Sequence, residues 1–125
     1  MSLKNLIYDP KTASGEAISK VESHTPKIEA PDEVKKNEVF KVKVSVGPHP
    51  NTIEHSIRWI ELYFEEEGRS FNPILIARFD FTPIYSEPMV EVYIKLNKSG
   101  RLIALEYCNL HGLWEAYKEV KVVST

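Results

Sequence analysis

The sequence predicts an all-β protein, an immunoglobulin-like antiparallel β-sandwich of about seven strands. Three observations predict it. Short segments of alternating apolar and polar residues recur along the chain. Turn residues, such as Gly47-Pro48 and residues 97–100, separate these segments, and no window of helical periodicity reaches three turns. Short strands at this spacing, bounded by turns, are typical of a two-sheet sandwich.

The strand-like pattern begins near residue 27. Between residues 40 and 46, apolar side chains alternate with lysine and serine, so one face of that segment is predicted to be buried. The segments that follow have the same period of two or are rich in aromatic and β-branched residues. The predicted strands after residue 27 cover residues 40–46, 57–65, 74–81, 89–96, 102–107 and 114–123.

Length, composition and charge favour one globular domain. A chain of 125 residues with 42% hydrophobic residues can bury a core without disulfide staples. A net charge of −2 argues against a nucleic-acid groove, and no apolar run is long enough to span a membrane. Residues 1–21 are expected to form an N-terminal tail and residues 22–125 the domain. The first residues lack a secretory pattern, so a cytoplasmic protein is expected.

All four histidines of the chain, together with its only cysteine, fall in or beside predicted loops. A single histidine is more often a surface or core residue than a ligand, and a single cysteine is more often a small buried apolar residue. Here, however, loops at the same end of a sandwich converge in space. The sequence therefore predicts one shared metal site. The candidate ligands are His24, His49, His55, Cys108 and His111.

This set of ligands favours iron. Structural zinc prefers four ligands in a tetrahedron, whereas four imidazoles and a thiolate make five and suit a metal with one open position. The C-x-x-H spacing of Cys108 and His111 also occurs in blue-copper β-sandwiches. Those proteins need a methionine shortly after the histidine, but the only methionines here are Met1 and Met89. Copper is therefore disfavoured.

Two motifs carry a family resemblance. HPNTIEH at residues 49–55, followed by IRWIELYF, and LIALEYCNLHGLWE at residues 102–115 resemble the signature of the superoxide reductases, the neelaredoxin and desulfoferrodoxin family. The resemblance covers roughly residues 22–123. Members with a desulforedoxin-like N-terminal domain carry four further cysteines for a second iron. Because Cys108 is the only cysteine, the chain resembles the one-iron class.

The resemblance implies one non-haem iron per chain, with the four histidines as equatorial ligands and Cys108 as the axial thiolate. It also implies a catalytic role for Glu22, which would ligate the oxidised iron and leave on reduction. Where most members have a lysine that attracts the anionic substrate, this chain has Ser23. Lys20 or Lys27 could replace that lysine, and the sequence leaves this choice open.

The implied activity is that of an oxidoreductase acting on superoxide. One electron and two protons convert superoxide into hydrogen peroxide without release of dioxygen. The implied partners are a small electron donor such as rubredoxin and, by analogy with one-iron relatives, further copies of the chain in a homotetramer. Two alternatives stay open: a cupredoxin-like electron-transfer protein that holds a metal but does not turn over superoxide, and a metal-free immunoglobulin-like binding module.

Overall fold

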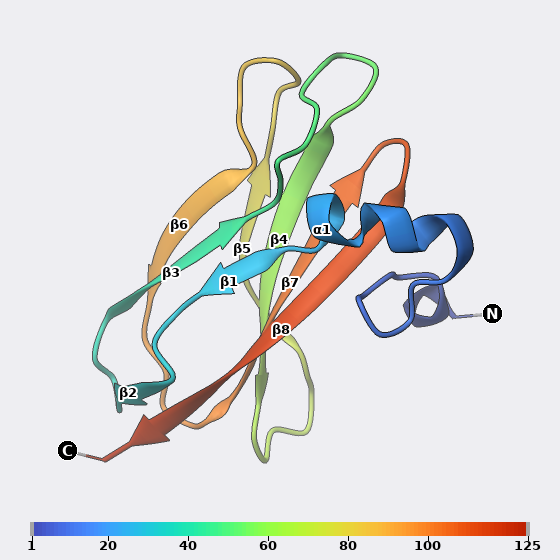
Figure 1. Ribbon diagram of the computed structural model, residues 1–125. Helices are drawn as coiled ribbons and strands as arrows, with labels where there is room; N and C mark the ends of the chain where they lie inside the picture. Colours follow the sequence, from blue (N-terminus) through green and yellow to red (C-terminus); the bar gives the residue numbers. More distant parts are fainter. Residues whose placement is uncertain (1, 125) are drawn as a thin grey trace.

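The computed structural model describes residues 2–124 and is a sandwich of two β-sheets (Figure 1). One sheet has three strands in the order β1-β3-β6, and the other has five in the order β2-β8-β7-β4-β5. The strands of the smaller sheet are β1 (Lys27–Glu29), β3 (Phe40–Ser45) and β6 (Met89–Ile94). Those of the larger sheet are β2 (Glu33–Lys35), β4 (Ile57–Glu66), β5 (Ile74–Asp80), β7 (Gly100–Cys108) and β8 (Gly112–Val123).

The core lies between the two sheets and follows the alternation in the sequence. Side chains at every second position of a strand point to the same face, so one set is buried and the other faces outward. On β4 the buried set is Ile60, Leu62 and Phe64, and on β3 it includes Val42 and Val44. Burial of these apolar side chains is the main source of stability. The predicted all-β sandwich is thus confirmed.

Two details differ from the prediction. The structure has eight strands rather than about seven, and β2 runs parallel to β8, so the sandwich is not purely antiparallel. The cause is the segment 30–32, through which the chain passes from β1 in one sheet to β2 in the other. Because β1 and β2 have only three residues each, their alternation is too short to be separated in the sequence.

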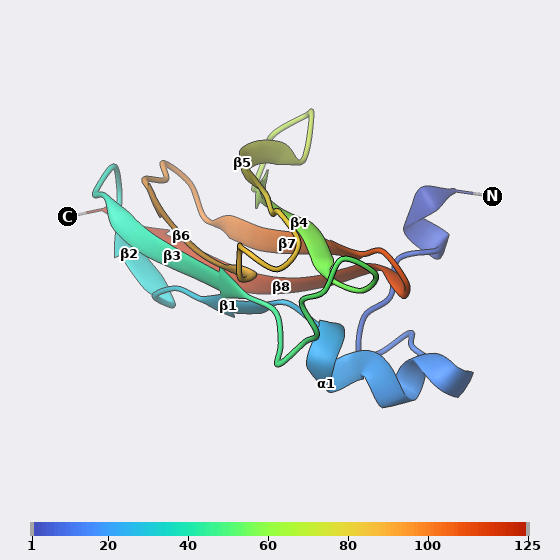
Figure 2. The ribbon, with the colours of Figure 1, turned by 90° about the horizontal axis from the view of Figure 1, so that it is seen from above.

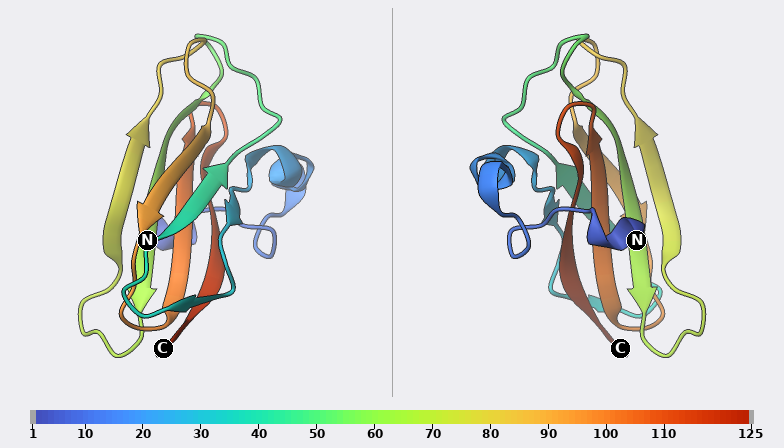
Figure 3. Two further views of the ribbon diagram at one scale, coloured as in Figure 1. Left: turned by 90° about the vertical axis from the view of Figure 1, so that its left-hand side faces the viewer. Right: turned by 90° about the vertical axis from the view of Figure 1, so that its right-hand side faces the viewer.

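Three short helices precede the first strand: η1 (Leu3–Asn5), η2 (Gly15–Lys20) and α1 (Val21–His24). The segment that carries them stands against the sandwich beside β8 (Figure 3). Tyr8 attaches it there, since its N–H donates to the Leu113 carbonyl at 2.9 Å and its carbonyl accepts from the Glu115 N–H at 2.9 Å. Within residues 2–124, no helix has both the length and the apolar character needed to cross a membrane.

Three histidine-bearing segments meet at one end of the sandwich. Helix α1, the loop from β3 to β4 and the turn from β7 to β8 lie together at the end away from the C-terminus (Figures 1 and 2). The β7–β8 turn is tight, with Cys108 paired to Gly112 in the ladder. Gly112 has a φ of 82°, a conformation that other residues rarely adopt. This turn sets Cys108 and His111 side by side.

Candidate metal centre

The four imidazole rings form a square. Neighbouring ring centroids along its sides are 4.6 to 5.0 Å apart, and the one diagonal with a measured separation, from His24 to His55, is 6.5 Å. Neighbouring rings meet edge to face, whereas the diagonal pair is nearly parallel. The order around the square is His24, His49, His55 and His111. Four imidazoles in this arrangement could together hold one metal ion.

Cys108 approaches this square from the core. Its Sγ lies 3.5 Å from Nε2 of His49 and 3.7 Å from Nδ1 of His111. One candidate ligand atom each from His24, His49, His55 and Cys108 lie within 4.8 Å of one another. Cys108 is fully buried, whereas three of the four histidines are half-buried. The thiol is therefore on the inner side of the cluster, and the outer side faces away from the core.

The inward nitrogen differs among the histidines. Nε2 of His24 lies 3.1 Å from Nε2 of His49 and 3.1 Å from Nδ1 of His111. His111 therefore turns its Nδ1 inward while His24 and His49 turn Nε2 inward. His111 is the last residue of the tight β7–β8 turn, and Nδ1 is the ring nitrogen closer to the backbone. The turn thus brings the His111 backbone close enough for Nδ1 to face the centre of the cluster.

The outward nitrogens of His24 and His49 are held by backbone carbonyls. Nδ1 of His49 lies 2.7 Å from the Pro50 carbonyl oxygen, and Nδ1 of His24 lies 3.0 Å from that of Lys20. The Ser23 hydroxyl also lies 2.7 Å from Nδ1 of His24 and donates to the same Lys20 carbonyl. A hydrogen on Nδ1 leaves Nε2 unprotonated and able to bind a metal, which is the usual arrangement around metal-bound histidine.

The surroundings of His24, His49 and His55 favour the neutral form of these three imidazoles. Burial is the largest cause that lowers the pKa of His24, to about 4, with a further contribution from His49. Burial also lowers the pKa of His49, and the pKa of His55 is lowered by burial, by His111 and by Lys20. A metal ion needs the neutral imidazole, so these shifts favour binding at neutral pH.

The Cys108 sulfur accepts hydrogen bonds from the backbone. Burial raises the pKa of the thiol, while the N–H groups of Leu110 and His111 lower it. Because a hydrogen bond to the charged form favours that form, these two donors offset part of the burial cost of a thiolate. A metal ion bound to the sulfur would supply the remaining stabilisation.

Asn109 and Asn51 fasten the histidine-bearing loops. The Asn109 side chain accepts from the Ser56 N–H at 2.9 Å and donates to the Glu54 carbonyl at 2.8 Å, which ties the β7–β8 turn to the loop that carries His55. Asn51 similarly accepts from the Ile84 N–H at 2.8 Å. The turn that carries His111 and the loop that carries His49 and His55 are thus tied to each other, and the latter is also tied to the β5–β6 loop.

The donor set fits a non-haem iron. Nε2 of His55 is buried and has no hydrogen-bond partner within the part of the chain that the structure describes. Buried polar atoms are normally paired, so this nitrogen points to a ligand that completes the site. Four neutral imidazoles with one thiolate suit a metal that accepts five ligands, as iron does, better than a tetrahedral structural zinc.

The structure places the other predicted residues around this cluster. Glu22 lies in α1, two residues before His24, and its exposed carboxylate is not part of the cluster. Lys20 is close enough for its charge to lower the pKa of His55. Lys27 instead donates from Nζ to the Gly47 carbonyl at 2.7 Å.

Sequence reasoning missed Glu106. Its side chain is fully buried, and neither carboxylate oxygen has a hydrogen-bond partner among residues 2–124. A signal was present in the strand alternation, because Glu106 falls on the same face of β7 as Leu102, Ala104 and Cys108. Burial raises the pKa of Glu106 to about 9, so the carboxyl is neutral at pH 7.

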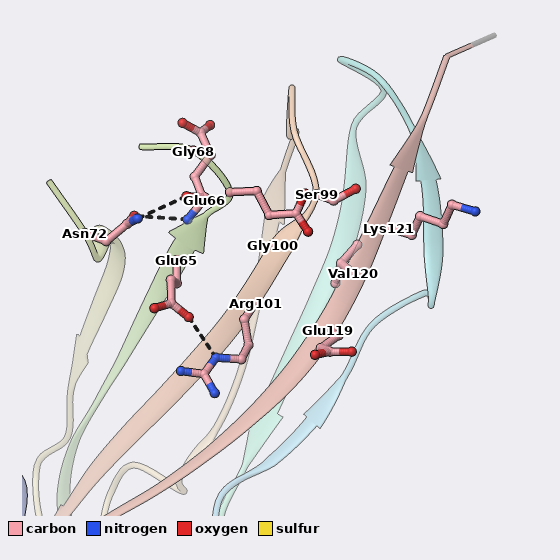
Figure 4. Close-up of a pocket in the computed structure, with 11 residues that line it drawn as sticks. Glu65, Glu66, Gly68, Asn72, Ser99, Gly100, Arg101, Glu119, Val120 and Lys121 are labelled. Carbon is pink, nitrogen blue, oxygen red and sulfur yellow. Dashed lines mark hydrogen bonds and ion pairs between the residues drawn. The ribbon is translucent and has the colours of Figure 1, made fainter. Parts of the chain in front are cut away.

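A second hollow lies at the opposite end of the strands, where β7 begins (Figure 4). Residues 65–67 and Glu119 bring carboxylates to it, and Glu65 pairs with Arg101 at 3.0 Å. The described residues that line it include no histidine or cysteine. This hollow is therefore separate from the metal centre and lacks its chemistry.

Comparison with known proteins points to one family. The desulfoferrodoxin family profile matches residues 16–117, a range that includes all five residues of the cluster. A superoxide reductase from Pyrococcus horikoshii is 52% identical over 103 residues, which cover 77% of this chain and 85% of the relative. Neelaredoxin from Megalodesulfovibrio gigas is 40% identical over 116 residues, with coverages of 81% and 88%. The solved structure of a superoxide reductase (neelaredoxin) from Ignicoccus hospitalis is 63% identical, has a TM-score of 0.93, and matches over 98% of this chain and 100% of that chain.

Proposed function

The chain belongs to the desulfoferrodoxin family, and from this premise we propose that it is a superoxide reductase with one non-haem iron. The observation that carries the proposal is the square of four imidazoles with the Cys108 sulfur on its inner side. A site of this kind leaves one position on the outer side for a small anion. His24, His49, His55, His111 and Cys108 are the proposed ligands.

The residues around the metal centre have distinct roles. When bound, the iron would supply the one-electron redox chemistry. The backbone carbonyls of Lys20 and Pro50 hold His24 and His49 in the orientation that turns Nε2 inward. Cys108, on the inner side of the square, would hold the iron as a thiolate and supply electron density to it. The buried inner wall keeps water away from the sulfur.

The test is the stoichiometry of superoxide consumption. Iron-loaded protein supplied with a reductant should consume superoxide and form one hydrogen peroxide per superoxide, without release of dioxygen. A metal-bearing electron-transfer protein would give no catalytic consumption, and a metal-free binding module would carry no iron and no visible absorption band. Either result would contradict the proposal.

Glu22 is the proposed ligand of the oxidised iron. Its position on the first turn of α1, two residues before His24, supports this role, as does the exposure of its side chain. Replacement of Glu22 by alanine should shift the ferric absorption spectrum but leave the ferrous reaction with superoxide within about twofold of wild type, because the carboxylate arrives only after oxidation. Glu16→Ala, an exposed glutamate of η2, is the matched control. An unchanged ferric spectrum at all pH values would remove Glu22 from the site.

Lys20 is the proposed cation that attracts superoxide in place of the lysine absent at Ser23. Its charge lowers the pKa of His55, which indicates that it lies near the cluster. Lys27 is already engaged with the Gly47 carbonyl. A positive charge beside an open site raises the local concentration of an anion and speeds its association, and the effect falls as salt increases.

Removal of the Lys20 charge should therefore slow the association of superoxide. We expect Lys20→Met to lower the second-order rate roughly 3- to 10-fold at low salt and to flatten its dependence on ionic strength. Lys27→Met should leave the rate and its dependence on ionic strength unchanged. Ser23→Lys should increase the rate and make that dependence steeper. Pulse radiolysis at several ionic strengths measures the rates. Equal rates and slopes in Lys20→Met and wild type would show that Lys20 does not steer the substrate.

A small electron-donor protein such as rubredoxin is the proposed redox partner. Support comes from Ile53 and Leu110, two exposed apolar side chains on the loops that carry the histidines. Leu110→Glu should slow reduction of the ferric protein by reduced rubredoxin several-fold, because a charge disrupts an apolar contact. Reaction of the ferrous protein with superoxide should be unaffected, and stopped-flow spectroscopy separates the two steps. Unchanged reduction would place the docking surface elsewhere.

A homotetramer is the proposed assembly. Its support is four exposed apolar side chains on or beside β5 and β6, each at the edge of one of the two sheets. These are Phe71, Leu75, Met89 and Tyr93. Light scattering of the purified protein measures the number of chains.

A further inference from the structure

One aromatic side chain of the N-terminal arm, residues 2–20, contacts Trp114, which lies beside the metal centre. The Tyr8 ring stacks on Trp114 with centroids 4.9 Å apart and planes tilted by 32°. Backbone hydrogen bonds to Leu113 and Glu115, both 2.9 Å, fix Tyr8 at the first residues of β8. The arm is thus joined to the strand that begins directly after His111.

Trp114 contacts two of the four histidines. Its Nε1–H donates to the His111 carbonyl at 3.0 Å, and its ring centroid lies 5.3 Å from that of His24. The side chain is only 1% exposed. His24 and His111 are themselves neighbours in the square, with 3.1 Å between their inward nitrogens. A shift of the indole would therefore move one side of the square.

We propose that Tyr8 is a positioning residue for the metal centre, which it orders by holding Trp114 against His24 and His111. This inference rests on the proposed function only in so far as the cluster binds iron. Without the Tyr8 ring, the outer face of the indole would lose its packing partner. The indole could then tilt away from His24 and weaken its bond to the His111 carbonyl.

The stacked ring, rather than the hydroxyl, carries this role. Within residues 2–124 the Tyr8 hydroxyl has no hydrogen bond to another side chain or to the backbone. Phenylalanine should therefore substitute for Tyr8, whereas alanine should not. Groups that orient metal ligands typically change metal affinity 10- to 100-fold when removed. Tyr8 acts through a second residue, so a smaller change is expected.

The experiment compares iron release from Tyr8→Ala, Tyr8→Phe and Tyr117→Ala. Tyr117 is a suitable control, because it is a half-exposed tyrosine on the same strand that stacks on Arg101 far from the histidines. Transfer of ferrous iron to a chromogenic chelator should be roughly 3- to 10-fold faster in Tyr8→Ala than in wild type. The ferric absorption band should also shift. Tyr8→Phe and Tyr117→Ala should match wild type in both measurements.

A double-mutant cycle with Trp114→Phe tests the path of the effect. Phenylalanine lacks the N–H that bonds to the His111 carbonyl, so Tyr8→Ala should accelerate iron release less in this background than in wild type. Equal acceleration in both backgrounds would overturn the role of Trp114 as the connecting residue.

The outcomes separate this inference from the proposed function. The positioning role of Tyr8 would be overturned if Tyr8→Ala released iron at the wild-type rate and its ferric band did not shift. A fall in melting temperature alone, of the size found for Tyr117→Ala, would not support that role. A wild-type protein that binds iron but does not consume superoxide would overturn the proposed function alone. A wild-type protein that holds no iron would overturn both.

Discussion

Cys108→Ser is expected to abolish the thiolate-to-iron absorption band and to slow superoxide reduction at least about 100-fold. Groups that only orient a ligand already change affinity or activity by up to about 100-fold, and a direct ligand should exceed that. Serine has nearly the same volume, but its hydroxyl stays protonated and gives no charge-transfer band with iron. Iron content, the visible spectrum and the rate of superoxide decay measure the outcome.

The structure allows a control for folding in this experiment. The Cys108 sulfur accepts from the backbone N–H groups of Leu110 and His111, and a serine hydroxyl can accept from the same donors. The turn should therefore keep its conformation, and far-UV circular dichroism should match wild type. His49→Ala should instead lower the iron content while leaving the band of the remaining iron-loaded protein in place. A Cys108→Ser protein with the wild-type visible spectrum would show that the sulfur is not a ligand.

The strands and the histidine cluster could be predicted because their signals are local. Alternation over 40–46 and 102–107 fixes which side chains of β3 and β7 face the core, and loops at one end of a sandwich necessarily meet. The residues of the cluster could then be predicted from topology, because the histidines lie between the predicted strands and the only cysteine lies directly at the end of one. What the structure adds is their order around the square.

Other features depend on contacts that no local pattern encodes. The inward Nδ1 of His111 depends on the conformation of the β7–β8 turn, and the parallel pairing of β2 depends on where the chain changes sheet. The contact of Tyr8 with Trp114 joins residues more than a hundred positions apart. Ser23 is a further case, since the sequence shows only a missing lysine, whereas the structure shows a hydroxyl that supports Nδ1 of His24.

Glu106 has the most unusual environment of any carboxyl group in the described part of the chain. It points into the sandwich two residues before Cys108, and neither oxygen finds a partner among residues 2–124. A buried carboxyl without a partner stays protonated, because burial penalises the charged form. Its charge, if present, would raise the pKa of Cys108 and oppose the thiolate. A neutral Glu106 therefore favours the charge that the metal site needs.

This environment makes the stability of the protein depend on pH. The pKa of Glu106 rises from 4.5 to about 9 on folding, so the folded state keeps a proton that the unfolded state releases in this range. The stabilisation linked to this proton is complete below about pH 4.5, and it is lost as the pH rises from there towards 9. One proton can contribute at most about 1.4 kcal/mol per pH unit to this loss.

Glu106→Gln should remove this dependence. Glutamine has the same shape and cannot ionise, so the variant's free energy of unfolding relative to wild type should increase by about 4 kcal/mol between pH 5 and pH 8, close to the limit for one proton over this range. Urea unfolding of the iron-loaded wild type and of the iron-loaded variant, at matched pH values, measures this difference in the free energy of unfolding. The histidine and cysteine ligands are common to both proteins, so their titration cancels in the difference. Glu119→Gln, the same substitution at an exposed glutamate of β8, is the matched control. If the Glu106→Gln difference is constant across this range, then Glu106 is ionised in the folded protein and an unseen partner compensates its charge.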